Sequence, residues 1–235
     1  MSIADNIARI RERISHAAAR SGRDPNSITL MAVSKTVEPA RISEAYVAGI
    51  RVLGENRVQE FAEKEAVLKD LAQAEWHLIG HLQSNKTNRA AELFQAVDSV
   101  DSLRLAKKLD HAAQQTGKNL SVLIEINVGG EESKSGIGPS SPELEEILNA
   151  AKDLSNLEIR GLMTIPPFTE DPQGARPYFR TFRELRDKIA ARNLPRVRMD
   201  VLSMGMSHDF EIAIEEGSTC IRVGTAIFGE RPKPT

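Results

Sequence analysis

Apolar runs typical of buried strands alternate with amphipathic segments typical of helices along the whole chain of 235 residues. The strand candidates are 28–34, 50–55, 75–80, 94–100, 120–128, 157–165, 198–204 and 220–229. Helix candidates follow them near 38–48, 56–72, 84–92, 102–116, 142–154, 172–193 and 208–216, and another, 3–20, precedes the first strand. Such alternation indicates a parallel sheet with right-handed crossovers. Because the chain is close to the length of about 250 residues typical of the fold, we predict a single (β/α)8 TIM-type barrel domain over 1–235, with an extra N-terminal helix.

An open doubly wound α/β sheet is the alternative architecture. Such a sheet normally carries a glycine-rich phosphate-binding turn after its first strand. The segment "AVSKTVEP", which ends the first strand candidate, contains no glycine. The sequence therefore favours the barrel over the open sheet.

The composition excludes several classes of protein. The net charge of -2 argues against a nucleic-acid-binding protein, which usually has a basic face. The single cysteine, Cys220, excludes an internal disulfide and fits a reducing compartment. The first helix candidate mixes charges and lacks the apolar core of a signal peptide, and no apolar run approaches the roughly 20 residues of a membrane span. We expect a cytoplasmic protein that binds neither nucleic acid nor membranes, and a monomer, since no exposed apolar stripe is evident.

Polar residues cluster where the predicted strands end, which is where barrels of this kind carry their chemistry. Lys35 follows the apolar run Met31–Val33, Asn56 follows the second strand, and His81 follows the third. We expect Asn56 to cap the following helix, whatever other role it has. A lysine at the end of a strand commonly extends its amine to solvent. A partly desolvated amine, by contrast, can form a Schiff base with a carbonyl compound. Taken alone, the position of Lys35 leaves both interpretations open.

The ends of the last two strands offer a candidate anion site. In "LSMGMSHDFEIAIEEG", the residues Ser203, Gly205, Met206 and Ser207 supply backbone N–H groups and hydroxyls before a predicted helix, with Ser207 as its N-cap. Asp209, close to that cap, counts against an anion. Gly224 and Thr225 close the last strand, and the loops after strands seven and eight are the usual phosphate site of this fold. The alternative is an ordinary capped helix.

Arg222 lies within the apolar strand "CIRVGTAIFG" and shares one face of it with Cys220 and Gly224. An arginine that points into a barrel needs a partner, because an unpaired buried charge is very costly. The partner is either a ligand or an acid such as Glu55 or Asp200. We favour the ligand.

The sequence lacks the common catalytic motifs and a metal site. His77 and His81 are spaced for a metal only if they lie on one helix, and here they span a strand and a turn. There is no HExxH, GxSxG, Walker or GxGxxG motif. An amine after the first strand and a phosphate pocket after the last two fit pyridoxal phosphate (PLP), which carries both an aldehyde and a phosphate.

Seven segments, in order along the chain, resemble the family of pyridoxal phosphate homeostasis proteins, whose barrel is similar to the N-terminal domain of bacterial alanine racemase. They are "AVSKT", "GENRVQE", "WHLIGHLQSNK", "EINVGGEESKSGI", "GLMTIPP", "LSMGMSHDFEIAI" and "IRVGTAIFG". The resemblance implies that Lys35 is the aldimine lysine and that Arg222 faces the pyridine nitrogen. It places Asn56 near the ring hydroxyl, His81 in the pocket, and Lys134 at a second, looser PLP site. The phosphate would be held by Ser203, Gly205, Met206, Ser207, Gly224 and Thr225. The family more often has an acid where this chain has His208, which we place on the first turn of the following helix.

Two functions follow from this resemblance. An arginine at the ring nitrogen cannot accept its proton, so the bound cofactor would be a weaker electron sink. Alanine racemase works with such an arginine but adds a second domain and a tyrosine base. This chain ends at Thr235, and Tyr46 and Tyr178 lie in predicted outer helices. We therefore expect a PLP carrier with no catalytic residue, acting in PLP homeostasis and in supply to PLP-dependent apo-enzymes; the alternative is a weak racemase or another PLP enzyme acting at the α-carbon.

Overall fold

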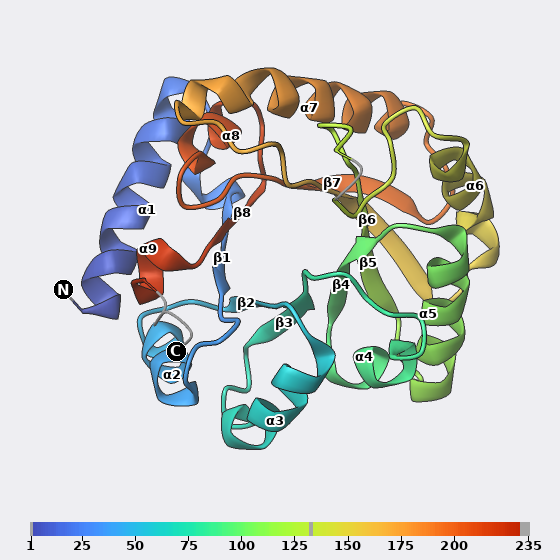
Figure 1. The fold of residues 1–235 in the computed structure, drawn as a ribbon, viewed down its shortest axis with the longest axis horizontal. Helices are drawn as coiled ribbons and strands as arrows, with labels where there is room; N and C mark the ends of the chain where they lie inside the picture. Colours follow the sequence, from blue (N-terminus) through green and yellow to red (C-terminus); the bar gives the residue numbers. More distant parts are fainter. Residues whose placement is uncertain (1, 132–133, 231–235) are drawn as a thin grey trace.

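The computed structural model describes residues 2–131 and 134–230, and its centre is a closed barrel of parallel strands (Figure 1). The strands pair in the order of the sequence, and the last strand pairs with the first. The barrel prediction is confirmed. The strands are β1 (Thr29–Val33), β2 (Val52–Glu55), β3 (Glu75–Leu78), β4 (Ala96–Val100), β5 (Leu120–Glu125), β6 (Leu157–Met163), β7 (Val197–Ser203) and β8 (Cys220–Val223).

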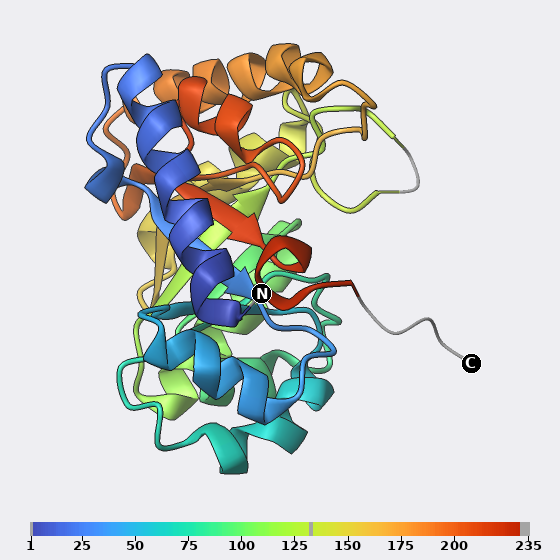
Figure 2. The same cartoon turned by 90° about the vertical axis from the view of Figure 1, so that its left-hand side faces the viewer.

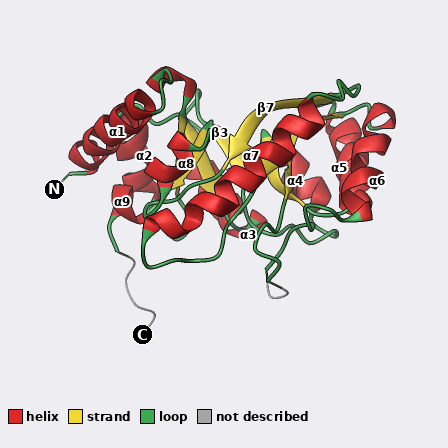
Figure 3. Ribbon diagram, turned by 90° about the horizontal axis from the view of Figure 1, so that it is seen from above, coloured by secondary structure: helices red, strands yellow, loops and turns green. Residues whose placement is uncertain are grey.

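Helices surround the barrel, and one follows each strand (Figures 1 and 3). Their buried side chains are mainly aliphatic and aromatic and join the outer face of the barrel in one core. Within the described ranges, no helix combines the length and apolarity needed to cross a membrane. The helices are α1 (Ile3–Arg20), α2 (Pro39–Val47), α3 (Val58–Leu68), α4 (Thr87–Leu93), α5 (Leu103–Thr116), α6 (Pro142–Ala150), α7 (Arg176–Ala190), α8 (Phe210–Glu215) and α9 (Thr225–Phe228).

The extra helix α1 lies on the outside of the barrel beside α2, α8 and α9 (Figure 2). Its start is fixed by a capping box, in which Ser2 and Asp5 exchange side-chain to backbone hydrogen bonds. Isoleucines recur at helical spacing on its buried face. The Asn6 amide donates to the carbonyl of Ile227 in α9 at 2.8 Å. These contacts attach the N-terminal helix to the last βα unit.

The predicted strand 220–229 is wrong in its second half. β8 ends at Val223, and α9 occupies Thr225–Phe228. The Gly224 carbonyl accepts from the N–H groups of Ile227 and Phe228, both at 2.9 Å, which closes a helical turn directly after the strand. A short apolar run has no periodicity that separates strand from helix, so the sequence pattern alone did not show this boundary.

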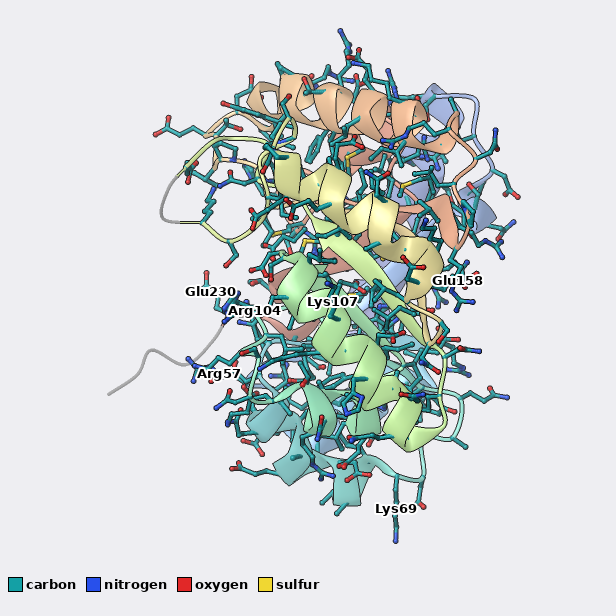
Figure 4. The ribbon with its side chains drawn as sticks, turned by 90° about the vertical axis from the view of Figure 1, so that its right-hand side faces the viewer. Arg57, Lys69, Arg104, Lys107, Glu158 and Glu230 are labelled. Atoms are coloured by element: carbon teal, nitrogen blue, oxygen red, sulfur yellow. The ribbon has the colours of Figure 1, made fainter. Side chains whose placement is uncertain are left out.

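Because all strands are parallel, their carboxyl ends share one mouth of the barrel and their amino ends share the other. Figure 4 shows the two mouths from the side. Arg57, Arg104 and Glu230, which follow β2, β4 and β8, lie on one side of the molecule, and Glu158, near the start of β6, lies on the opposite side. We call these sides the carboxyl-end mouth and the amino-end mouth.

Candidate functional site

Lys35 lies half-buried in the turn that follows β1 at the carboxyl-end mouth. The residues on both sides of it are held by neighbouring elements. Ser34 donates its hydroxyl to Glu55 Oε1 at the end of β2, at 2.7 Å. The backbone N–H of Thr36 donates to Glu60 Oε1 in α3, at 2.6 Å. The chain therefore fixes the backbone from which the Lys35 amine extends.

Glu55, the last residue of β2, packs against this turn through its contact with Ser34. Its side chain is fully buried, and its Oε1 lies 3.4 Å from Lys64 Nζ, which also pairs with Glu60 at 2.7 Å. Burial raises the pKa of Glu55, an effect that Lys64 and the Ser34 hydroxyl oppose. Within the described chain, Glu55 Oε2 has no hydrogen-bond partner. From the sequence, Glu55 was considered as an acid at the strand ends that could pair with Arg222, but it was given no role in holding a ligand.

Arg222 on β8 is a buried cation, with only 3% of its surface exposed. Its Nη1 donates to the Ser203 hydroxyl at 2.8 Å, and its Nη2 donates to the Thr164 carbonyl at 2.7 Å. Over the described residues it forms no salt bridge. Glu55 is held by Ser34 and Lys64, and Asp200 pairs with Arg160, so the two acids considered from the sequence are not its partners.

Several carboxylates act electrostatically on Arg222 across the barrel, and Glu125 at the end of β5 is the most informative of them. Its side chain is 6% exposed, and its Oε2 lacks a hydrogen-bond partner among the described residues. Burial and the nearby Asp101 raise the pKa of Glu125 to about 7, whereas Arg222 and His81 act to lower it. The site thus contains an acid that changes its charge near neutral pH. Glu125 was not predicted as a site residue, although it is the one carboxylate within the apolar run "LSVLIEINV".

The segment after β7 differs from its prediction. α8 begins at Phe210, so Ser207 is not its N-cap, and His208 lies in the preceding turn, where its Nε2 is 3.1 Å from the Thr169 carbonyl. The backbone N–H of Met206 donates to Asp209 Oδ1 at 2.7 Å. The acid therefore occupies one of the N–H groups that we had assigned to an anion.

The rest of this segment keeps a backbone geometry that can hold an anion. Gly205 has φ +94°, and a Cβ at this position would lie 2.5 Å from the Ala213 Cβ, so a larger residue does not fit. The Ser207 hydroxyl accepts from the Ala226 N–H of α9 at 3.5 Å. The Gly205 carbonyl accepts from the Arg222 N–H at 3.0 Å. These bonds bring the segment after β7 against the end of β8.

Gly224 and Thr225 lie beside the turn that carries Lys35. Met31 of β1 and Arg222 of β8 are partners in the strand register. A Cβ on Gly224 would lie 3.4 Å from the Val33 Cβ, so the end of β8 runs next to the end of β1. The N–H of Thr225, the first residue of α9, has no acceptor within its own helix.

Asn56 and His81 lie at the rim of the same mouth. Asn56 is half-buried, and a Cβ on Gly80 would lie 2.9 Å from its Oδ1, which places it against the end of β3. The N-cap position of α3 is Arg57 and has no side-chain cap, so the expectation that Asn56 caps this helix is wrong. The His81 side chain is 56% exposed, with its Nδ1 3.1 Å from Asp101 Oδ2.

Lys134 belongs to a different set of elements. It lies in the loop after β5, in which residues 132–133 are outside the described residues. Its Nζ lies 2.9 Å from Glu131 Oε2 and donates to the Pro166 carbonyl, in the loop after β6, at 3.2 Å. The structure therefore supports Lys35 and Lys134 from separate parts of the mouth.

The carboxyl-end mouth combines three kinds of group. It has an amine for a carbonyl compound at Lys35, a buried guanidinium at Arg222, and hydroxyls with a glycine-shaped backbone after β7 and β8. Arginine has five N–H donors, so its two hydrogen bonds leave donors for a ligand. In the described chain, no group of three or more histidines, cysteines and acids is arranged to hold a metal ion. This donor set fits an anionic organic molecule that carries a carbonyl group.

Comparisons with known proteins agree with this arrangement. Residues 3–232 match the family of the alanine racemase N-terminal domain. The pyridoxal phosphate homeostasis protein of Aquifex aeolicus is 47% identical over 231 residues, which cover 98% of this chain and 99% of that protein. That of Pseudomonas aeruginosa is 46% identical, with coverage of 98% and 96%. PipY of Synechococcus elongatus, solved with PLP bound, has a TM-score of 0.84 and 38% identity, with coverage of 97% and 100%. This chain therefore belongs to the family of pyridoxal phosphate homeostasis proteins, within the wider family of alanine racemase N-terminal domains.

Proposed function

We propose that this protein binds PLP at the carboxyl-end mouth, holds it covalently but reversibly through Lys35, and supplies it to PLP-dependent apo-enzymes in the cytoplasm. The observation that carries the proposal is the buried Arg222, which Ser203 and Thr164 hold beside the strand that positions Lys35. Burying a guanidinium is costly when some of its N–H donors have no acceptor within the protein. An acceptor on a bound cofactor would offset that cost.

Each part of the mouth has its own role in this proposal. The Lys35 amine bonds to the aldehyde carbon, with loss of water. The hydroxyls of Ser203, Ser207 and Thr225, with the backbone of Gly205, Met206 and Gly224, hold the phosphate, although Asp209 already accepts the Met206 N–H. Asn56 and His81 border the ring from the side of β2 and β3. Lys134 is a candidate for a second, looser PLP site.

Arg222 also decides how the cofactor behaves. Bound PLP supplies an electron sink for reactions at the α-carbon of amino acids. A guanidinium is always protonated and only donates hydrogen bonds, so Arg222 would leave the pyridine nitrogen without a proton. Carrying the cofactor needs a bond that reverses easily and no strong electron sink. This residue therefore suits storage better than catalysis.

Reduction with borohydride tests the covalent site. On protein loaded with PLP, peptide mapping after reduction is expected to find the label on Lys35, and Lys35→Ala is expected to lose it. Lys134→Ala is the matched control and is expected to keep the Lys35 label. Full labelling of Lys35→Ala on another lysine would overturn the assignment.

Transfer tests the carrier function. Loaded protein is mixed with a PLP-dependent apo-enzyme while a phosphatase destroys free PLP, and recovered enzyme activity is measured. Recovery from loaded wild type and none from Lys35→Ala is the expected result. If recovery depends only on the free PLP concentration, the protein stores PLP without delivering it.

One observation favours an enzyme that acts at the α-carbon. Such an enzyme needs a base at the mouth, and Glu125 is a buried acid whose pKa of about 7 suits that work. Proton NMR of amino acids in D2O with loaded protein measures loss of the α-proton. Loss that disappears in Glu125→Gln would replace the carrier proposal with an enzyme, whereas no loss in wild type excludes this second candidate.

A further inference from the structure

The amino-end mouth, opposite the proposed PLP site, opens into a cavity of about 550 Å³. Barrels of this fold normally fill their interior with bulky branched side chains. Here the strands begin with small or polar residues that line the cavity, including Thr29, Ala96, Ser121 and Cys220. The volume falls in the range of small-molecule sites, and none of the residues proposed to hold PLP lines it.

A His–Asp pair, in which the acid is buried and the histidine half-buried, forms part of the wall of this cavity. His77 Nδ1 lies 3.1 and 3.2 Å from the two carboxylate oxygens of Asp98, which is 1% exposed. Burial acts to lower the pKa of His77, but Asp98 and then Glu75 raise it, and the net shift is upward. Burying a charged pair has a desolvation cost, and the proposed PLP chemistry at the other mouth does not use this pair.

A second group of charged side chains at this mouth has no net charge. Asp200 lies 2.7 Å from Arg160 and 3.3 Å from Arg198, and Glu158 lies 3.8 Å from each of these arginines. Two cations and two anions thus form one neutral network. Its arginines are already paired, so the network offers little to an anionic ligand.

Glu75 is a third acid at this mouth; it acts electrostatically on Arg160 and gives the acids an excess of one over the two arginines. It is exposed, it begins β3 two residues before His77, and within the described ranges it forms no salt bridge. The His77–Asp98 pair has no net charge when His77 is protonated and a net negative charge when His77 is neutral, so in either state the cavity keeps an excess of negative charge that includes Glu75. Val52, Val122, Leu123 and Val201 add aliphatic surface to the same cavity, and Val52 is the register partner of Glu75 in β2.

We propose that the amino-end cavity binds a small aliphatic ammonium compound. Its ammonium group would pair with Glu75, close to the His77–Asp98 pair, and its hydrocarbon part would lie along the aliphatic wall. The excess of one acid selects a cation, and the lack of a metal-binding cluster in the described chain favours an organic one. This site does not depend on the proposed PLP function, so a negative result here would leave that function unaffected.

Three probes of equal length test the proposal on the full chain: n-butylammonium, 1-butanol and butyrate. The readout is the proton NMR signal of the His77 ring, assigned by its absence in His77→Gln. Saturable displacement of this signal by n-butylammonium, with none by 1-butanol or butyrate, is the expected result. No saturation with n-butylammonium, or equal displacement by butyrate or 1-butanol, overturns the proposal.

A matched pair of variants locates the ammonium group. Glu75→Gln keeps the shape of an exposed side chain and is expected to weaken n-butylammonium binding about tenfold, as loss of a charge-assisted contact requires. Glu146→Gln makes the same change on the outer face of α6 and is expected to leave the affinity unchanged. Equal affinity in Glu75→Gln and wild type would show that Glu75 does not hold the ligand.

Discussion

The two mouths of the barrel differ in how deeply they bury their charged side chains. At the carboxyl-end mouth, Arg222, Glu55 and Glu125 are almost completely buried, and an oxygen of each acid lacks a hydrogen-bond partner within the described chain. At the amino-end mouth, Arg160 and Asp200 pair with each other while their side chains stay 33% and 39% exposed. A cavity of about 550 Å³ nevertheless opens at the amino-end mouth. Most of the buried charge thus lies at the carboxyl-end mouth, whereas the charged side chains around the amino-end cavity, apart from the buried Asp98, stay partly exposed.

The largest expected effect comes from removing the buried cation. Arg222→Met leaves the buried Ser203 hydroxyl and Thr164 carbonyl without their donor and removes the cation that acts on Asp98, Asp209 and Glu125, so we expect a loss of about 3–5 kcal/mol in the free energy of unfolding. Urea denaturation at pH 7 measures this loss. Arg198→Met, at the exposed amino-end mouth, is the control and should change stability by less than about 1 kcal/mol. A loss below about 1 kcal/mol in Arg222→Met would remove the contrast between the two mouths.

Glu125 should make stability depend on pH. Its pKa is raised from an ordinary value of 4.5 to about 7, so the folded state holds a proton that the unfolded state has released. Stability therefore falls as the pH rises from 4.5 through about 7, by about 3 kcal/mol from this group. Urea denaturation at several pH values, compared between wild type and Glu125→Gln, isolates this contribution. Parallel pH profiles for the two proteins would contradict a buried, titrating Glu125.

Glu55→Gln should stabilise the protein while reducing the reaction of PLP with Lys35. Burial raises the pKa of Glu55, so the ionised carboxylate has a cost at neutral pH that an amide avoids. We expect a gain of about 1 kcal/mol by urea denaturation, with less labelling of Lys35 because the Ser34 contact is weaker. Glu63→Gln, exposed on α3, should change neither quantity. A clear loss of stability would mean that the charge of Glu55 stabilises the fold.

The smallest effect is expected at the amino-end mouth. Asp200→Asn weakens its ion pairs with Arg160 and Arg198, which are open to solvent. Such pairs contribute about 0–1 kcal/mol, and salt reduces them further. Thermal denaturation at low and high ionic strength measures the difference from wild type. An effect as large as that of Arg222→Met would show that the two mouths do not differ in how they hold charge.

Most elements of the barrel followed from sequence patterns, and the errors share one cause. The periodicity of α1 and the apolar run of β6 are local properties, and both elements formed where they were expected. Asn56, Ser207 and the end of β8 were misjudged because capping and strand ends depend on which backbone groups neighbouring elements leave unpaired. A local pattern contains no information about those neighbours.

The sequence by itself determined the barrel, the placement of Lys35 after the first strand and of Arg222 on the last, and the segments that resemble the PLP homeostasis family. Only the tertiary structure decided which partners Arg222 has, how deeply Glu55 and Glu125 are buried, and that the amino-end mouth is hollow. The reason is that hydrophobic periodicity is a property of a single segment of about 10–15 residues. Desolvation of a charge and the filling of a cavity depend instead on side chains that strands far apart in the sequence bring together.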